Sequence, residues 1–238
     1  MKKLKYIFLL AGALSLASCE SWLDEDPQYT INTKTQFSTV ENAKQALMGC
    51  YGYMSADNAY GQAWQEVTFG YCGFGWSQTN GSSTDLLVSM DGGIDETINT
   101  MAWRGMYKVI GETNAFIANI ADSPLESADK LPMEAAARFL RALAYYNLAV
   151  TYGDVPLKTT PSAHDGVAVP RSPKNEVFEL VRTDWEFAYE NLPEKDDDGF
   201  ATKWAAKALA LNPKILFFDE PTSNLDALSE EKITNMIE

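Results

Sequence analysis

The chain has 238 residues, of which 46% are hydrophobic and 22% charged, a composition typical of a globular protein. Its formal net charge of −14 at pH 7 excludes general binding to nucleic acid, because phosphates need a basic surface. Three cysteines are too few for a disulfide-stapled scaffold, no Cys or His cluster predicts a metal site, and the single histidine, His164, excludes catalysis by paired histidines.

Residues 1–18 form a predicted secretion signal. Three lysines precede an apolar run from Tyr6 to Ala17, which has the length of a signal-peptide core and is too short to span a bilayer. The run ends in Leu-Ala-Ser-Cys, which resembles the bacterial lipobox. We therefore expect cleavage before Cys19 and lipidation of that cysteine. The alternative is an ordinary secretory signal whose cysteine is incidental. Residues 19–37 are predicted to be a polar tether.

Four apolar stripes with helical spacing follow the tether, and a fifth begins at Ala201. A capping box of Ser38 and Glu41 is predicted to start the first helix, and Ser172 as N-cap with Pro173 at the next position is predicted to start the fourth. All stripe residues are expected to face the core. The stripes comprise Ala43, Ala46, Leu47, Cys50 and Met54; Trp103, Met106, Ile110, Ile117 and Ile120; Phe139, Leu143, Tyr146 and Val150; and Val177, Val181, Trp185, Ala188 and Leu192.

The predicted helices favour a mainly α fold. Helices of about 15 to 20 residues in pairs are typical of tetratricopeptide-like hairpins, which pack side by side and leave a concave face. The strict tetratricopeptide consensus is absent, and no repeat of about 34 residues stands out. The fold prediction therefore rests on helix length and pairing rather than on a repeat.

Two cysteines, Cys50 and Cys72, remain after the predicted lipidation of Cys19. Outside the cytoplasm they could form a disulfide. Cys50 also lies on the first apolar stripe, where a buried free thiol fits the pattern equally well. The sequence leaves both alternatives open.

A long irregular insertion is predicted from Asp57 to Thr100, where Gly, Ser, Thr, Asn and aromatic residues follow no helical period. Irregular segments of this length are often functional. Flat aromatic faces beside amides suit a sugar, whose C–H face stacks and whose hydroxyls form hydrogen bonds. Trp76, Tyr71 and Asn80 are the predicted glycan-binding residues. The alternative is a loop whose aromatic residues, Trp64 among them, anchor it on the helices.

Three stretches resemble the SusD/RagB family of outer-membrane lipoproteins from Bacteroidetes. They read WRGMYKVIGETNAFIANI (103–120), EAAARFLRALAYYNLAVTYGDVPL (134–157) and RSPKNEVFELVRTDWEFAYENLP (171–193). The second is the most specific, down to its Tyr-Gly-Asp-Val-Pro turn. The resemblance identifies residues 38–209 as the N-terminal helical domain of such a protein, with about half of a family-length chain absent.

This resemblance implies a binding protein rather than an enzyme, with no cofactor. Family members are lipid-anchored in the outer membrane and exposed at the cell surface. They work with a SusC-like TonB-dependent barrel and help to capture oligosaccharides for import. The resemblance itself transfers no sugar-binding position, so Trp76, Tyr71 and Asn80 rest on composition alone.

Residues 210–238 resemble a different family, the ATPases of ABC transporters. A short apolar run precedes Asp219 and Glu220, as in the Walker B motif, and Asp226 lies where the D-loop begins. The resemblance implies roles for these residues at magnesium, at the attacking water and at a dimer contact. None of the 238 residues supplies the Gly-rich loop that binds nucleotide phosphates. We therefore predict a chimera joined within Lys207–Leu211, whose orphan strand–turn–helix fragment has no ATPase activity. For the function of the whole chain, the first alternative to a glycan-binding lipoprotein is a non-functional chimeric fragment, and the second is an ATP-binding subunit of an ABC transporter.

Other conspicuous polar residues are expected to have structural roles. Arg138 and Arg141 lie one turn apart and are predicted to form ion pairs on the helix surface. Asp154 is predicted to shape the turn before the proline of Tyr-Gly-Asp-Val-Pro. The acids at 196–198 lack the alternating spacing of a calcium loop, which favours a solvated loop.

Overall fold

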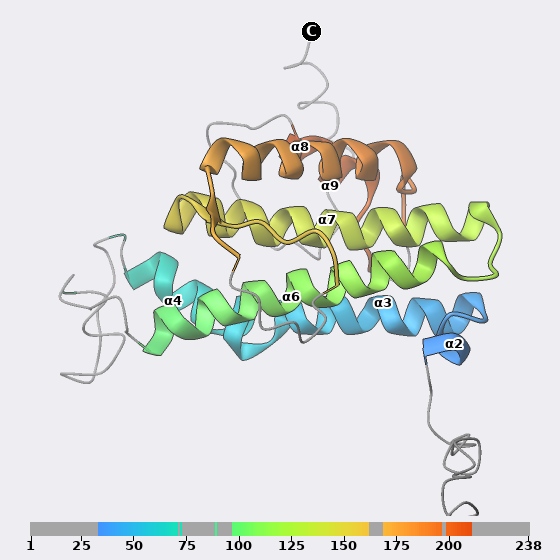
Figure 1. Cartoon of the computed structure of the whole chain (residues 1–238), viewed down its shortest axis with the longest axis horizontal. Coiled ribbons are helices and arrows are strands. Elements are labelled where there is room, and N and C mark those ends of the chain that lie inside the picture. Colours follow the sequence, from blue (N-terminus) through green and yellow to red (C-terminus); the bar gives the residue numbers. More distant parts are fainter. Residues whose placement is uncertain are drawn as a thin grey trace, which may run out of the picture. The chain divides into compact units, whose positions relative to one another are not determined.

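The computed structural model describes residues 33–70, 72, 89, 97–161, 169–196 and 199–210 (Figure 1). The chain divides into two units, Met1–Thr33 and Lys34–Glu238, and the elements from α3 onward belong to the second. Within the described residues, no helix is both long and apolar enough to cross a membrane.

The described part of the chain is mainly helical, which confirms the predicted fold class. The helices are α2 (Thr33–Gln36), α3 (Val40–Ser55), the π-helical turn η2 (Asp57–Gly61), α4 (Ala63–Gly70), α6 (Thr97–Ala121), α7 (Ser127–Tyr152), α8 (Lys174–Asn191) and α9 (Lys203–Ala210). Two short strands, β1 (Val155–Pro156) and β2 (Arg171–Ser172), pair antiparallel between α7 and α8.

Helix α7 lies at the centre of this arrangement. It packs between α6 and α8 and also contacts α3, while α9 covers α8 (Figure 1). The short connection between α6 and α7 makes these two long helices an antiparallel hairpin. The hairpin character expected from helix length and pairing is therefore present.

The apolar stripes face the core where a helix has neighbours on one side, and the stripe on α7 does not. Every residue of the fourth stripe is buried, and the first stripe is buried apart from the half-buried Ala46. On α7, Phe139 is buried, but Leu143 and Tyr146 are half-buried and Val150 is 52% exposed. Because α7 has neighbours on several sides, its alanines are buried on other faces, and a single stripe does not describe it.

The first helix begins one residue later than a Ser38 capping box would require, so that prediction is wrong. Thr39 is the N-cap of α3, and its Oγ1 accepts a hydrogen bond from the Asn42 N–H at 3.2 Å. Ser38 instead donates to the Thr35 carbonyl at 2.7 Å and closes the short helix α2. Helix α8 has Pro173 rather than Ser172 at the N-cap, a shift of one residue.

The predicted irregular insertion is partly helical, which corrects its boundaries. Residues 57–70 form η2 and α4, and α6 begins before Thr100, at Thr97. Trp64 is only 6% exposed and packs in the core, so the anchoring alternative holds for this side chain. The turn η2 lies against α6 so closely that a Cβ on Gly105 would approach the Asn58 carbonyl oxygen to 1.9 Å.

Neither described cysteine forms a disulfide. Cys50 is a buried free thiol, and Cys72 is an exposed one. Burial, together with the negative charge of Glu112, raises the pKa of Cys50 to about 12. The buried-thiol alternative is therefore the one that the structure contains.

Candidate functional site

The site residues predicted from sequence all lie outside the described residues. They are Cys19, Tyr71, Trp76, Asn80, Asp219, Glu220 and Asp226. What the structure does place is the pair of helices that bracket the predicted glycan-binding residues, since α4 ends at Gly70 and α6 begins at Thr97. The end of α7 lies beside the first turns of α6, where Tyr152 Oη donates to the Asn99 carbonyl at 3.4 Å.

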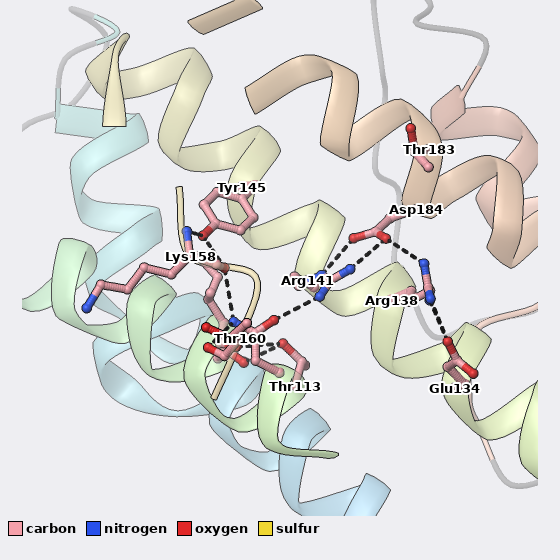
Figure 2. Close-up of polar contacts among 12 residues, drawn as sticks. Thr113, Glu134, Arg138, Arg141, Tyr145, Lys158, Thr160, Thr183 and Asp184 are labelled. Atoms are coloured by element: carbon pink, nitrogen blue, oxygen red, sulfur yellow. Dashed lines mark hydrogen bonds and ion pairs between the residues drawn. The ribbon is translucent and has the colours of Figure 1, made fainter. Parts of the chain in front are cut away.

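A buried ion pair joins the middle of α7 to the middle of α8. Arg141 donates to Asp184 through two parallel hydrogen bonds, Nε to Oδ2 and Nη2 to Oδ1, each 2.8 Å long (Figure 2). Asp184 is 0% exposed and Arg141 is 5% exposed. The predicted helix-surface ion pair is therefore wrong for Arg141, because the guanidinium points inward to a carboxylate on the next helix.

Asn114 extends the ion pair to α6 and to the segment that follows β1. Its Oδ1 accepts a hydrogen bond from Arg141 Nη1 at 2.8 Å. Its Nδ2 donates to the carbonyls of Lys158 and Thr160, at 3.0 and 3.3 Å. The side-chain oxygen and nitrogen of this buried amide therefore both have partners. Asn114 joins α6 to α7 and to the loop directly, and to α8 through Arg141.

Two tyrosines hold the same segment by its backbone. Tyr145 Oη accepts from the Lys158 N–H at 2.6 Å and donates to the Lys158 carbonyl at 2.8 Å (Figure 2). Tyr107 Oη donates to the Pro156 carbonyl at 2.7 Å. Burial raises the pKa of Tyr145 to about 12 and also raises the pKa of Tyr107, so both phenols keep their protons, and donate, further into the alkaline range than an exposed tyrosine does. Residues 156–160 are thus fixed independently of their own side chains.

Arg138 has a more exposed environment than Arg141. Its guanidinium bonds to Glu134 Oε1 one turn away, with Nε at 2.8 Å, which confirms the predicted helix-surface ion pair. Its Nη1 also lies 3.5 Å from Asp184 Oδ1, and its guanidinium stacks over Phe187 at 4.2 Å from the ring centroid. Arg138 therefore covers the outer edge of the buried ion pair.

Two of the acidic residues singled out in the sequence, Asp154 and Asp196, bond to backbone N–H groups, whereas residues 197–198 lie outside the described residues. Asp154 Oδ1 accepts from the N–H of Lys174, the first residue of α8, at 2.9 Å, so it ties the end of α7 to the start of α8. Asp196 Oδ1 accepts from the Phe200 N–H at 3.2 Å. Across the described ranges, no group of three or more His, Cys, Asp or Glu side chains could hold a metal ion.

Three half-buried aromatic side chains lie next to the fixed segment and are called the aromatic group below: Trp103, Tyr107 and Tyr152. The Trp103 ring centroid is 5.0 Å from that of Tyr107 and 5.1 Å from that of Tyr152, with the second pair edge to face. The Tyr107 ring also packs edge to face on Tyr145 at 6.5 Å. The aromatic group is therefore connected to the buried polar network through Tyr145.

The buried polar network of Arg141, Asp184 and Asn114 was not predicted from the sequence, although one sequence signal pointed to it. Asp184 lies three residues after Val181 and four before Ala188, so it falls on the apolar stripe of α8. Asn114 similarly interrupts the stripe of α6. A charged or amide residue on an apolar helical face predicts a buried partner, because an unpaired buried polar group is costly.

Comparison with known proteins gives a consistent family match. Residues 21–212 match the SusD-like family model, described as starch-binding, associating with outer membrane. SusD-like protein P25 of Formosa agariphila is 26% identical over 215 residues, which cover 84% of this chain and 40% of that protein. A SusD-like protein of Bacteroides ovatus is 27% identical over 213 residues, covering 87% and 38%. The chain thus spans about two fifths of the length of these curated relatives.

Solved structures give the same fold. A SusD superfamily protein from Bacteroides thetaiotaomicron superposes with a TM-score of 0.64 at 25% identity, covering 72% of this chain and 41% of that one. A laminarin binding SusD-like protein superposes with a TM-score of 0.60 at 24% identity, covering 72% and 39%. The family match ends at residue 212, and the predicted ATPase-like fragment that follows lies outside the described residues.

Proposed function

The chain belongs to the SusD-like family of carbohydrate-binding, non-catalytic proteins that associate with the outer membrane, and from this premise we propose that it binds glycan at the cell surface. The observation that carries the proposal is the family match over residues 21–212, which include the described helical body. The acidic net charge of −14 suits a neutral ligand better than a polyanion.

Within this function, we propose Trp76, Tyr71 and Asn80 as glycan contacts. The support is chemical, since aromatic faces stack on pyranose rings and an amide bonds to their hydroxyls. It is also architectural, because the helices on either side of these residues, α4 and α6, pack on one another in the described body. The residues to which this segment is attached, Gly70 and Thr97, therefore belong to helices that are held in the body.

Calorimetric titration of the full chain with maltoheptaose and with laminarihexaose tests this proposal. The first sugar represents starch, and the second represents laminarin, the ligand named for one structural relative. We expect binding of at least one sugar without its hydrolysis, and about tenfold weaker binding by Trp76→Ala. Trp185→Phe is the matched control, because Trp185 is buried in α8 and should leave affinity unchanged. Failure of the unaltered chain to bind either sugar would contradict the proposal.

We further propose that Cys19 carries a lipid anchor and that a SusC-like TonB-dependent barrel is the partner. The lipobox-like sequence supports the anchor, and family membership supports the barrel. Cys19→Ala should abolish incorporation of labelled palmitate and release the protein from the membrane fraction. Affinity purification after cross-linking in intact cells should recover a TonB-dependent barrel. Retention of label by Cys19→Ala would rule out the anchor.

The ATPase-like character of residues 210–238 stays a prediction, and we propose no catalytic role for Asp219, Glu220 or Asp226. The absence of a phosphate-binding loop from the 238 residues supports this proposal. Addition of a magnesium–nucleotide analogue should leave the melting temperature unchanged. A rise that depends on both magnesium and nucleotide would overturn the proposal.

A further inference from the structure

The aromatic group of Trp103, Tyr107 and Tyr152 brings three partly exposed rings into mutual contact beside the fixed segment 156–160. Each of the three side chains keeps part of its surface exposed, whereas Trp64 and Trp185 are 6% and 3% exposed. Aromatic rings dominate contact energies at binding surfaces when they are rigid and partly accessible. Trp103 and Tyr107 lie one turn apart on α6, so their rings border one surface.

The two tyrosine rings are fixed by hydrogen bonds through their hydroxyls, and both rings pack on Trp103. Tyr107 Oη donates to the Pro156 carbonyl, and Tyr152 Oη donates to the Asn99 carbonyl. Pro156 in turn opens the segment that Tyr145 and Asn114 hold by its backbone. Little side-chain freedom therefore remains to be lost when a ligand binds, which favours affinity.

One charged side chain, that of Arg171, lies beside the aromatic group. Arg171 pairs with Pro156 across the two short strands, and the Pro156 carbonyl accepts the hydrogen bond of Tyr107. The Arg171 side chain is exposed and exerts its charge on Tyr107. A guanidinium offers five N–H donors, which suit the hydroxyl oxygens of a sugar.

We propose that the aromatic group is a carbohydrate-stacking surface, with the Trp103 indole as the platform for one pyranose ring and Arg171 as a hydroxyl-binding side chain at its edge. The inference rests on the proposed glycan-binding function and adds contact residues on the helical body to it. The ligand class is a neutral oligosaccharide, because partly exposed aromatic rings lie beside an exposed guanidinium on a chain whose net charge of −14 disfavours a polyanion.

Calorimetry of the full chain with maltoheptaose and laminarihexaose tests the proposal in four variants. Trp103→Ala should weaken binding about tenfold, and Trp103→Phe, which keeps a flat ring, should lie within about threefold of the unaltered chain. Arg171→Ala should weaken binding by about threefold to tenfold with an unchanged melting temperature, because its side chain is exposed. Trp185→Phe should bind as the unaltered chain does.

The outcomes separate this inference from the function on which it rests. If the unaltered chain binds sugar and both Trp103→Ala and Arg171→Ala bind equally well, the inference is overturned and the glycan-binding function stands. If the unaltered chain binds neither sugar, both are overturned. Should Trp103→Ala fail to fold, Arg171→Ala decides the matter, because this exposed side chain lies on β2 and its removal leaves the helix packing intact. Unchanged sugar binding by Arg171→Ala would then overturn the inference.

Discussion

The two halves of α6 show how one helix serves two purposes. In the first half, Trp103 and Tyr107 leave aromatic surface exposed, and Gly105 admits the backbone of η2. In the second half, Asn114 is buried and bonds to Arg141 of α7 and to two loop carbonyls. The first half thus presents a surface, whereas the second half holds three helices and a loop in register.

The difference has a physical basis in what each kind of side chain can tolerate. A partly exposed aromatic ring costs little, because water still reaches its edges. A buried amide or ion pair is tolerated only when each polar atom has a partner, and the partners then specify a single arrangement. We therefore expect changes in the second half to act mainly on stability and changes in the first half to act on binding or on local packing.

The largest expected effect comes from removing the carboxylate on which the second half depends. Asp184→Ala leaves the buried Arg141 guanidinium without its partner and should lower the free energy of unfolding by about 3–5 kcal/mol. Urea unfolding followed by circular dichroism measures it. Glu134→Ala is the matched control, since this partly exposed i,i+4 pair with Arg138 contributes under about 1 kcal/mol. A loss of less than about 1 kcal/mol of unfolding free energy in Asp184→Ala would contradict the claim that the second half of α6 acts mainly on stability.

A smaller effect is expected in the first half, where packing rather than charge is tested. A Cβ on Gly105 would lie 1.9 Å from the Asn58 carbonyl oxygen, so Gly105→Ala must displace η2 and should cost about 1–3 kcal/mol. Gly111→Ala is the matched control in the second half, because a Cβ there meets nothing within 4 Å. That control should stabilise the helix by up to about 1 kcal/mol. Equal changes in the free energy of unfolding for Gly105→Ala and Gly111→Ala would show that η2 can be displaced from α6 without cost.

The sequence predicted those parts of the fold that follow from one helix taken alone. The stripe of α8, from Val177 to Leu192, is buried as expected, because α8 has its neighbours on one side. The stripe of α7 failed at Val150, because a helix surrounded on several sides carries no single apolar face. The hydrophobic periodicity of a helix does not predict how many other helices will pack against it.

The buried polar network of Arg141, Asp184 and Asn114 could not be predicted from the sequence, because its contacts depend on how the helices pack. Arg141 and Asp184 are 43 residues apart, so their pairing depends on the register of α7 against α8. Helical spacing linked Arg141 to Arg138 and suggested a surface role, which was correct only for Arg138. The predicted glycan contacts Trp76, Tyr71 and Asn80 lie outside the described residues and remain predictions.

The smallest expected effect is a pH dependence of the free energy of unfolding. It arises from Cys50 of α3, which feels the charge of Glu112 in the second half of α6. Burial and the charge of Glu112 raise the pKa of Cys50 from 9.0 to about 12. Between pH 9 and pH 12 the unfolded chain therefore loses a proton that the folded chain retains. The stabilisation is complete below pH 9 and is lost as the pH rises, by about 1 kcal/mol at pH 10.

Urea unfolding at pH 8 and pH 10 measures this loss of stability, with each variant compared to its own value at pH 8. Cys50→Ala should lose less stability than the unaltered chain, whereas Cys72→Ser should behave like it, because Cys72 is exposed. An identical loss in Cys50→Ala would mean that the alkaline sensitivity comes from the buried tyrosines. One of these, Tyr145, packs on Tyr107 of the first half of α6 and shares the Lys158 carbonyl with Asn114 of the second half.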